Sequence, residues 1–181
     1  YSQIIPTHDT NYEDTVKWNR TSNALVGRLY NNIGEKFGWN ADGELYLTGY
    51  RAGDFRLKGE IFKSFEWKKG IASWKVNGSM INQQPSFWYE QWGSNNFEWH
   101  NNMKKEFRID IGTTFSYPAR MAELEFNYAI IDNYPDFGTD ALPSQYEGGL
   151  SVAALKVSKE VRAWKFHLAA DLLVQQSSNT E

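Results

Sequence analysis

Two glutamates and a histidine are the residues of this 181-residue chain whose types and spacing come nearest to catalytic chemistry. Glu123 and Glu125 are two positions apart, so on a strand both side chains lie on one face about 7 Å apart. That separation suits paired carboxylates in glycoside hydrolysis, and His167 could act as a general base. A solvated or ion-paired surface is the commoner use of such residues, and we expect no catalytic residue here.

The other reactive residue types form no recognisable site. His8, His100 and His167 lie far apart, without the His-Glu-x-x-His spacing of a metalloenzyme, and the chain has no cysteine. The glycine-rich loops that bind nucleotides and the Gly-x-Ser-x-Gly elbow of hydrolases are also missing. We therefore expect no metal, no cofactor and no enzymatic activity.

One segment, residues 85–100, is rich in aromatic side chains. Its residues with the strongest potential for ligand contact are Trp88, Tyr89, Trp92 and Trp99. Such rings could form a stacking platform for sugars or a loop that constricts a pore. They could equally form a self-packed loop together with an aromatic girdle, because Trp and Tyr favour a membrane boundary. The second interpretation is the more generic one.

Composition excludes several classes of protein. A formal net charge of −3 and an aromatic content of 16% exclude a disordered chain and argue against nucleic-acid binding, which requires a basic surface. Apolar runs are far shorter than the roughly 20 residues that a membrane-spanning helix needs. The first residues do not resemble a signal peptide, so we expect any such peptide to have been removed or to lie upstream. The low mean hydropathy of −0.62 fits a soluble protein and also a membrane β-barrel.

The strongest signal is a two-residue alternation of apolar and polar side chains, which predicts β-strands with one apolar and one charged face. It runs through five segments, residues 55–61, 72–80, 106–115, 122–130 and 164–175. None of their apolar faces carries a charge. The segments reach about 10 or 11 residues, the length that a tilted strand needs to cross a bilayer. Strand length therefore favours a membrane barrel over a soluble sandwich.

Connector lengths support this interpretation. Short connectors at 68–70, 117–120 and 158–159 alternate with long ones at 82–104 and 132–147. Outer-membrane barrels have short turns on one side and long loops on the other. The sequence therefore predicts an antiparallel meander of membrane strands.

Less regular segments complete the predicted meander. Residues 15–20 and 24–31 read as strands joined by a turn at 20–23. All short turns should lie on the same side of the barrel. We therefore expect 24–40 and 44–65 to form one long hairpin with residues 41–43 at its tip and a bulge at 51–54. Residues 148–157 form the weakest strand.

That makes about eight strands, with both outer ends on the long-loop side. A complete bacterial barrel keeps its ends on the short-turn side. We therefore expect residues 1–181 to form a single β-barrel segment that is part of a larger barrel.

Several short stretches resemble a known family. They are Gly27-Arg28-Leu29-Tyr30-Asn31-Asn32, Gly49-Tyr50-Arg51-Ala52-Gly53-Asp54-Phe55, Gly93-Ser94-Asn95-Asn96-Phe97, Tyr117-Pro118-Ala119-Arg120 and Ala141-Leu142-Pro143-Ser144-Gln145-Tyr146. They resemble the putative porin family of outer-membrane β-barrels from Bacteroides-type bacteria, over roughly residues 27–178. The resemblance implies a transport role. It names no solute and brings no catalytic residues.

The sequence thus predicts an all-β, antiparallel membrane β-barrel in the bacterial outer membrane, a porin that passes small polar solutes passively or with weak selectivity. We expect it to contact outer-membrane lipid, to bind no nucleic acid, and to be able to associate with further copies or with other outer-membrane proteins. The residues predicted to line the pore are Arg56, Lys58, Glu60, Lys75, Glu106, Arg108, Asp110, Glu123, Glu125, Lys165 and His167. The alternative is a soluble glycan-binding β-sandwich that uses the loop at 85–100.

Overall fold

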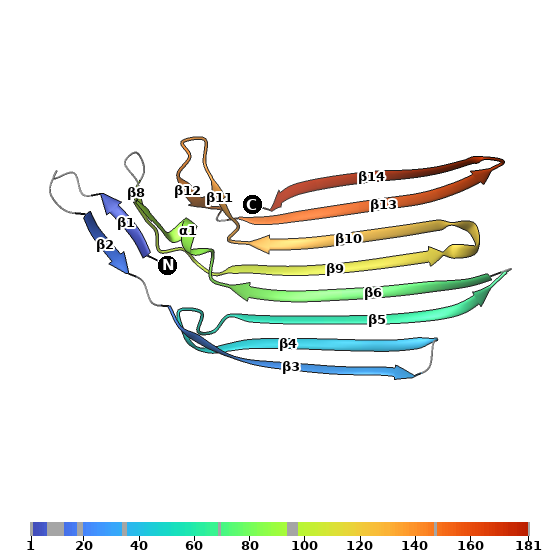
Figure 1. Ribbon diagram of the computed structural model, residues 1–181, viewed down its shortest axis with the longest axis horizontal. Coiled ribbons are helices and arrows are strands. Elements are labelled where there is room, and N and C mark those ends of the chain that lie inside the picture. Colours follow the sequence, from blue (N-terminus) through green and yellow to red (C-terminus); the bar gives the residue numbers. More distant parts are fainter. Residues whose placement is uncertain are drawn as a thin grey trace.

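The computed structural model of the chain describes residues 2–6, 13–17, 20–33, 36–68, 70–93, 98–146 and 148–180. Eight antiparallel strands form one sheet in simple meander order (Figure 1). These strands are β3 (Ser22–Ile33), β4 (Phe37–Gly49), β5 (Phe55–Trp67), β6 (Gly70–Gln83), β9 (Glu106–Tyr117), β10 (Ala122–Asp132), β13 (Gly149–Ala163) and β14 (Phe166–Thr180). The predicted all-β antiparallel meander is confirmed.

The smaller elements lie in the connections and before the sheet. They are the hairpin β1 (Ser2–Pro6) with β2 (Glu13–Lys17), the helix α1 (Phe87–Glu90), the hairpin β7 (Gln91–Gly93) with β8 (Glu98–His100), the 3₁₀ turn η1 (Pro118–Arg120), and the hairpin β11 (Pro135–Phe137) with β12 (Pro143–Gln145). The three hairpins gather at one end of the sheet (Figure 1). Among the described residues, no helix has the length and apolar character to cross a membrane.

The two ends of the sheet differ in their connections. At one end, short connections join β3 to β4, β5 to β6, β9 to β10 and β13 to β14. At the other end lie the long β6–β9 and β10–β13 connections, the five-residue β4–β5 turn, the start of β3 and the last residues of β14. The predicted alternation is confirmed for the short connectors at 68–70 and 117–120 and the long ones at 82–104 and 132–147. We call these the short-turn end and the long-loop end.

The predicted hairpin tip at residues 41–43 is wrong. These residues lie in the middle of β4, where Asp42 is paired with Arg28 on β3 and Lys58 on β5. An Asp-Gly pair favours a turn, but the apolar-polar alternation continues through it without a break. Reversing the chain there would have interrupted a strand that is paired on both sides.

The predicted bulge at residues 51–54 is also wrong, because this segment is the turn between β4 and β5. Gly49 and Gly53 have φ angles of +86° and +78°, and the Ala52 amide donates to the Gly49 carbonyl at 3.0 Å. An irregularity of the β-bulge type occurs instead in the β3–β4 pairing, where Asn23 and Ala24 pair with Thr48 and Tyr46 and Leu47 of β4 is skipped.

The outermost strands also differ from the prediction. Residues 13–17 pair with β1 in a separate two-stranded sheet and do not join the meander, while 18–19 lie outside the described residues. Near the C-terminal end, the turn falls at Trp164 and Lys165 instead of 158–159. β13 is therefore a 15-residue strand, longer than the weak strand predicted there.

The pairing register divides the sheet into two continuous faces. Leu57, Met80, Ile109 and Ile130 are aligned across β5, β6, β9 and β10, so they share one face. The next register row, Lys58, Ser79, Asp110 and Ala129, lies on the opposite face. The predicted apolar sides of five separate segments thus join into one surface. We call the two surfaces the apolar face and the polar face.

The apolar face is exposed. Leu57, Trp74, Ile111 and Leu168 are 51%, 54%, 54% and 65% exposed. Apart from prolines, the buried apolar side chains of the described residues are only Ala72, Met103 and Ile131. A β-sandwich would cover this face with a second sheet. In the described part of the chain the other sheets are the small hairpins, so the sandwich alternative finds no support in the fold.

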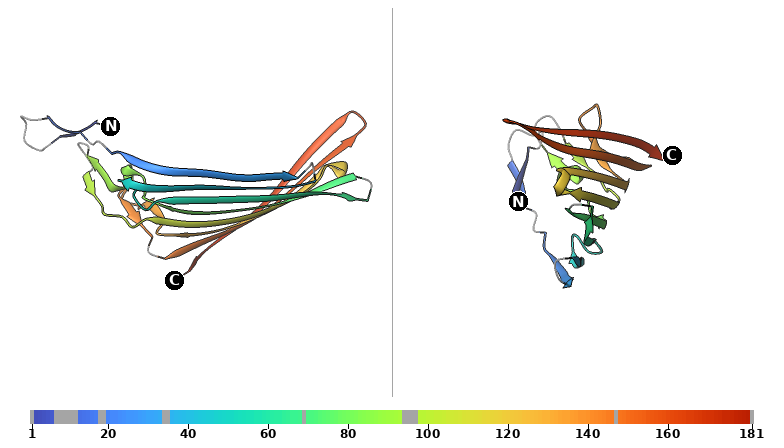
Figure 2. Two further views of the ribbon diagram at one scale, coloured as in Figure 1. Left: turned by 90° about the horizontal axis from the view of Figure 1, so that it is seen from below. Right: turned by 90° about the vertical axis from the view of Figure 1, so that its right-hand side faces the viewer.

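The sheet is curved toward its polar face. In the middle of β13 the apolar-face residues Leu155 and Val157 are exposed, whereas the adjacent polar-face residues Lys156 and Ser158 are half-buried. The apolar-face residues of β13 are thus more exposed than the polar-face residues, which is expected when the polar side is concave. Figure 2 shows the twisted sheet from two further sides, with β3 and β14 at opposite edges. Neither edge is paired with another described strand.

Candidate functional site

Ion pairs and hydrogen bonds on the polar face run both between strands and along them. Arg28 on β3 donates through Nε to Asp42 on β4. Arg108 donates through Nε and Nη2 to the Asp110 carboxylate at 2.6–2.9 Å, and Ser79 on β6 donates to the same carboxylate at 3.0 Å. The polar face therefore carries pairs of opposite charge.

Ten of the predicted pore-lining residues share this face. They are Arg56, Lys58, Glu60, Lys75, Glu106, Arg108, Asp110, Glu123, Glu125 and His167. Lys165 lies instead in the β13–β14 turn, with its Nζ 5.2 Å from the centre of the Trp164 ring. The sequence pattern had placed Lys165 inside a strand that begins only at Phe166.

The polar face is hollowed over β6, β9, β10 and β13. The hollow has a volume of about 570 Å³. Arg108, Asp110, Asn77 and Asn127 contribute polar groups to its lining, and Tyr134 from the β10–β13 connection stands at its edge. Ala129, Val152 and Ala154 supply small apolar side chains. Such a volume falls within the range of small-molecule sites.

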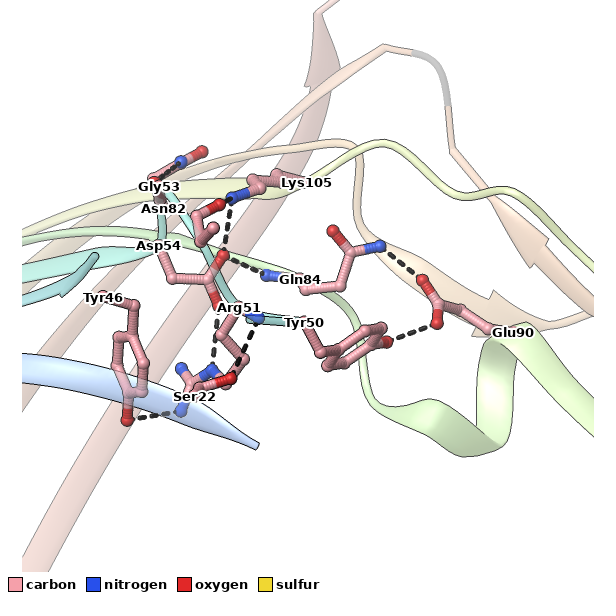
Figure 3. Close-up of polar contacts among 11 residues, drawn as sticks. Ser22, Tyr46, Tyr50, Arg51, Gly53, Asp54, Asn82, Gln84, Glu90 and Lys105 are labelled. Atoms are coloured by element: carbon pink, nitrogen blue, oxygen red, sulfur yellow. Dashed lines mark hydrogen bonds and ion pairs between the residues drawn. The ribbon is translucent and has the colours of Figure 1, made fainter. Parts of the chain in front are cut away.

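At the long-loop end, a buried carboxylate joins three segments (Figure 3). Asp54, which is 1% exposed, receives Arg51 Nε at 2.8 Å, Lys105 Nζ at 2.8 Å and the main-chain amide of Gln84 at 3.1 Å. Lys105 Nζ also donates to the Ala52 carbonyl at 2.6 Å. Asp54 thus ties the β4–β5 turn to both ends of the β6–β9 connection.

A second buried carboxylate extends this network. Glu90 on α1 is 7% exposed and accepts hydrogen bonds from the Tyr50 hydroxyl and the Gln84 side-chain amide (Figure 3). Arg20 Nη1 lies 3.4 Å from the same carboxylate. Burial raises the pKa of Tyr50 to about 12, and its hydrogen bond to Glu90 acts in the same direction. The loop end is therefore fixed by two buried carboxylates that Gln84 links.

The sequence does not predict this network. Its pattern places Asp54 in a bulge and Glu90 in an aromatic loop, and it marks neither residue as a buried anchor. A signal was available in Gly49 and Gly53, which bracket a turn. The partners Lys105 and Gln84 could not be identified, because they belong to segments that approach Asp54 only in the folded sheet.

The aromatic residues of segment 85–100 pack on one another. Trp92 and Trp99 face each other across β7 and β8, with ring centres 6.1 Å apart, and Trp88 lies 5.2 Å from Trp92. Trp99 Nε1 donates to the Trp88 carbonyl at 2.9 Å, and Tyr89 contacts Phe137 of the other long connection. Residues 94–97 of this segment lie outside the described residues.

A second group of aromatic residues marks the short-turn end of the apolar face. The Trp67 ring contacts Phe115 at 5.2 Å and Tyr117 at 5.5 Å between ring centres, and the Tyr117 hydroxyl donates to the Trp67 carbonyl at 3.0 Å. Lys68 in the adjoining turn lies over the Trp67 ring. Amphipathic rings beside lysine are the usual composition of a membrane–water boundary.

The residues considered for catalysis do not converge. Glu125 accepts a hydrogen bond from the Asn127 amide at 2.8 Å, while His167 Nε2 lies 2.9 Å from a Glu160 carboxylate oxygen near the short-turn end. Within the described ranges, no group of three acidic or histidine side chains is placed to hold a metal ion. His8 lies outside these ranges.

Comparison with known proteins agrees with this architecture. A family model described as "Putative porin" matches residues 2–181. Searches of curated proteins and of solved structures returned no significant match. The family match covers nearly the whole chain, and the resemblance found in the sequence is confirmed: the chain belongs to the putative porin family.

Proposed function

We propose that this chain forms part of the wall of an outer-membrane pore that passes small polar solutes passively or with weak selectivity. The observation that carries the proposal is the exposed apolar face, which extends over all eight strands. A continuous apolar surface of this size is unstable in water and is stable against acyl chains. The strands, of 11–15 residues, are long enough to cross a bilayer.

The polar face would then line the aqueous lumen. Positive and negative side chains alternate across it, as in the aligned row of Arg28, Asp42, Lys58 and Asp110. Such a surface orders water and favours solutes that can exchange hydrogen bonds with it. Its nearly balanced signs favour weak selectivity between anions and cations. No enzymatic step is needed for this role.

The two free edges support a larger assembly. Each main-chain N–H or C=O group of β3 and β14 that had no hydrogen-bond partner in lipid would destabilise the protein by several kcal/mol. We therefore propose that residues 1–181 are one segment of a larger barrel, closed by further strands. Outer-membrane lipid would contact the apolar face, and the same face would be available for association with further copies or other outer-membrane proteins.

Cysteine substitution tests which face meets water. This chain has no cysteine, so Ser79→Cys on the polar face and Met80→Cys on the apolar face give matched single thiols on one strand. In full-length protein in vesicles, a charged, water-soluble thiol reagent should modify Ser79→Cys at least tenfold faster. Equal rates, or faster reaction of Met80→Cys, would exclude a membrane-facing apolar surface.

The pore itself is tested by electrical recording. Full-length protein in a planar bilayer should give stepwise ion currents. A barrel that reacts with thiol reagents as proposed but carries no current would retain the topology and lose the transport function.

A further inference from the structure

The lining of the hollow on the polar face includes two asparagines that flank a glycine. One register row contains Asn77, Gly112, Asn127 and Ala154, on β6, β9, β10 and β13. Gly112 stands between the two asparagines. A Cβ atom placed on Gly112 would lie 2.5 Å from Asn127 Oδ1 and 2.9 Å from Asn77 Nδ2. The missing side chain therefore lets two amide groups converge over the strand between them.

These amides are available for a ligand. Asn127 uses one donor for Glu125, which leaves its second N–H and its carbonyl oxygen. Asn77 makes no side-chain hydrogen bond to another described residue in this structure, and it is only half-buried. Each amide can both donate and accept. Together they offer hydrogen bonds of both kinds within a small area.

The charges in the hollow cancel. Arg108 and Asp110, the charged residues that line it, are joined to each other through two guanidinium nitrogens at 2.6–2.9 Å. A single charged solute would have to break this pair or meet a like charge. A neutral solute with several hydroxyl groups can bond to the pair as it stands, because the guanidinium retains free N–H groups and the carboxylate retains lone pairs.

The rest of the lining is apolar. Ala129 on β10 is the register neighbour of Asp110, and Val152 and Leu150 follow on β13 in the rows of the charged pair. Tyr134 adds an aromatic ring with a hydroxyl group. The C–H faces of a sugar ring are apolar, while its edge carries hydroxyls. A surface on which amides and an ion pair lie beside small aliphatic groups complements both parts of such a ring.

We propose that the hollow formed by Asn77, Gly112 and Asn127, with the Arg108–Asp110 pair, is a binding site for a neutral polyhydroxylated solute of the sugar class. This inference rests on the proposed pore, because it assigns a solute class to the polar face. The site would hold a sugar briefly at the wall during passage. Affinity in the millimolar range is sufficient for that purpose, because tight binding would slow release.

Binding is measured independently of conduction. Full-length protein in detergent is mixed with maltotriose, a neutral oligosaccharide, and contact is recorded by saturation-transfer difference NMR. Trigalacturonate, a sugar trimer with three carboxylates, serves as the charged comparison. Maltotriose should bind at least fivefold more tightly than trigalacturonate.

Variants locate the site. Asn77→Ala and Asn127→Ala should each weaken maltotriose binding about fivefold, the loss expected for one hydrogen bond. Gly112→Ala retains both amides but forces them apart, and it should weaken binding by a similar factor. Asn40→Ala is the matched control, because Asn40 lies in the same register row on β4, outside the hollow. It should leave binding unchanged.

The outcomes separate the two proposals. Ion current in a bilayer without maltotriose binding overturns the sugar site and keeps the pore. Binding without current keeps the site and overturns the pore. Binding that is equally weakened by Asn40→Ala, or unaffected by the three variants in the hollow, shows that sugar contacts the polar face elsewhere and overturns this assignment.

Discussion

Asp54 and Lys105 form an ion pair in which Oδ1 and Nζ lie 2.8 Å apart, and the carboxylate is 1% exposed. Asp54 belongs to the β4–β5 turn, whereas Lys105 ends the long β6–β9 connection. The pair therefore holds the β6–β9 connection, a loop of more than twenty residues, against the long-loop end of the sheet. Asp54 is thus one of the two buried carboxylates, with Glu90, that hold this loop in position.

Removing the charge of Asp54 should loosen the long-loop end. Asp54→Asn keeps the size of the side chain but leaves Arg51 and Lys105 without their anion. We expect the free energy of unfolding to fall by about 2 kcal/mol, since hydrogen bonds to charged groups contribute roughly 1.5–3 kcal/mol. Urea unfolding of the protein in vesicles measures the change.

A surface carboxylate provides the control for Asp54. Asp171 lies 4.0 Å from Lys156 and its side chain is 62% exposed. Asp171→Asn should change the free energy of unfolding by less than about 0.5 kcal/mol. If both variants lose the same stability, Asp54 does not anchor the loop.

The raised pKa of Tyr50 predicts a loss of stability in alkaline solution. Tyrosine in the unfolded chain ionises near pH 10, whereas Tyr50 in the folded protein has a pKa of about 12. Between these values the unfolded chain has released a proton that the folded protein still holds. The free energy of unfolding should therefore fall as the pH rises from about 10 to 12.

Tyr50→Phe should flatten this part of the pH profile of stability. Glu90→Gln is a useful comparison, because it removes the negative charge beside the hydroxyl and leaves the burial that is the larger cause of the raised pKa. Its profile should lie between those of the natural protein and Tyr50→Phe. A profile of Tyr50→Phe identical to the natural one would contradict the assignment.

The two faces of β9 should respond differently to an added charge. Ile111 lies on the apolar face near the middle of the strand and is 54% exposed. Ile111→Arg should reduce the free energy of unfolding by about 2–4 kcal/mol, the effect of arginine at the lipid midplane of a barrel. Thr114→Arg, on the polar face of the same strand, should cost less than about 1 kcal/mol. The reverse order would mean that the polar face meets lipid.

A lysine pair on β5 tests the electrostatics of the lumen. Lys58 lies on the polar face and Lys63 on the apolar face near the short-turn end. Lys58→Gln should shift the reversal potential in a salt gradient toward that of a more cation-selective pore, because it removes a positive charge from the path. Lys63→Gln should leave the reversal potential unchanged. Equal shifts would argue against a lumen bounded by the polar face.

The β4–β5 turn depends on a glycine. Gly49 has a φ of +86°, and a Cβ there would lie 1.8 Å from the Thr21 carbonyl oxygen. Gly49→Ala should reduce the free energy of unfolding by about 2 kcal/mol or more, from backbone strain and the clash. Gly27→Ala, where nothing lies within 4 Å of the new atom, should change it by less than about 1 kcal/mol. Urea unfolding distinguishes the two variants.

The strands and their faces could be predicted because a two-residue period is a local property. Phe126 and Leu124 reveal the face of β10 without knowledge of any partner strand. Strand ends were harder. Asp42-Gly43 has the composition of a turn, yet it lies inside β4, since the alternation on both sides keeps it paired with β3 and β5.

The candidate site was predictable in part for the same reason. Charged residues on a strand face, such as Arg108 and Glu125, stand out in the sequence. The hollow does not, because it depends on Gly112 being aligned with Asn77 and Asn127 on two other strands. Cross-strand register is a tertiary property, and no local pattern specifies which small residue will lie between which amides.

The meander order bears on how the protein assembles. Each of the eight strands pairs only with the sheet strands that come immediately before and after it along the chain. No strand therefore has to wait for a distant part of the chain before it can pair. The sheet can grow by successive hairpins, with the free edge of the newest strand acting as the template for the next. In the proposed barrel, the long β6–β9 and β10–β13 connections and the β4–β5 turn would have to be carried to the far side of the bilayer, while the connections of the short-turn end stay on the side of entry.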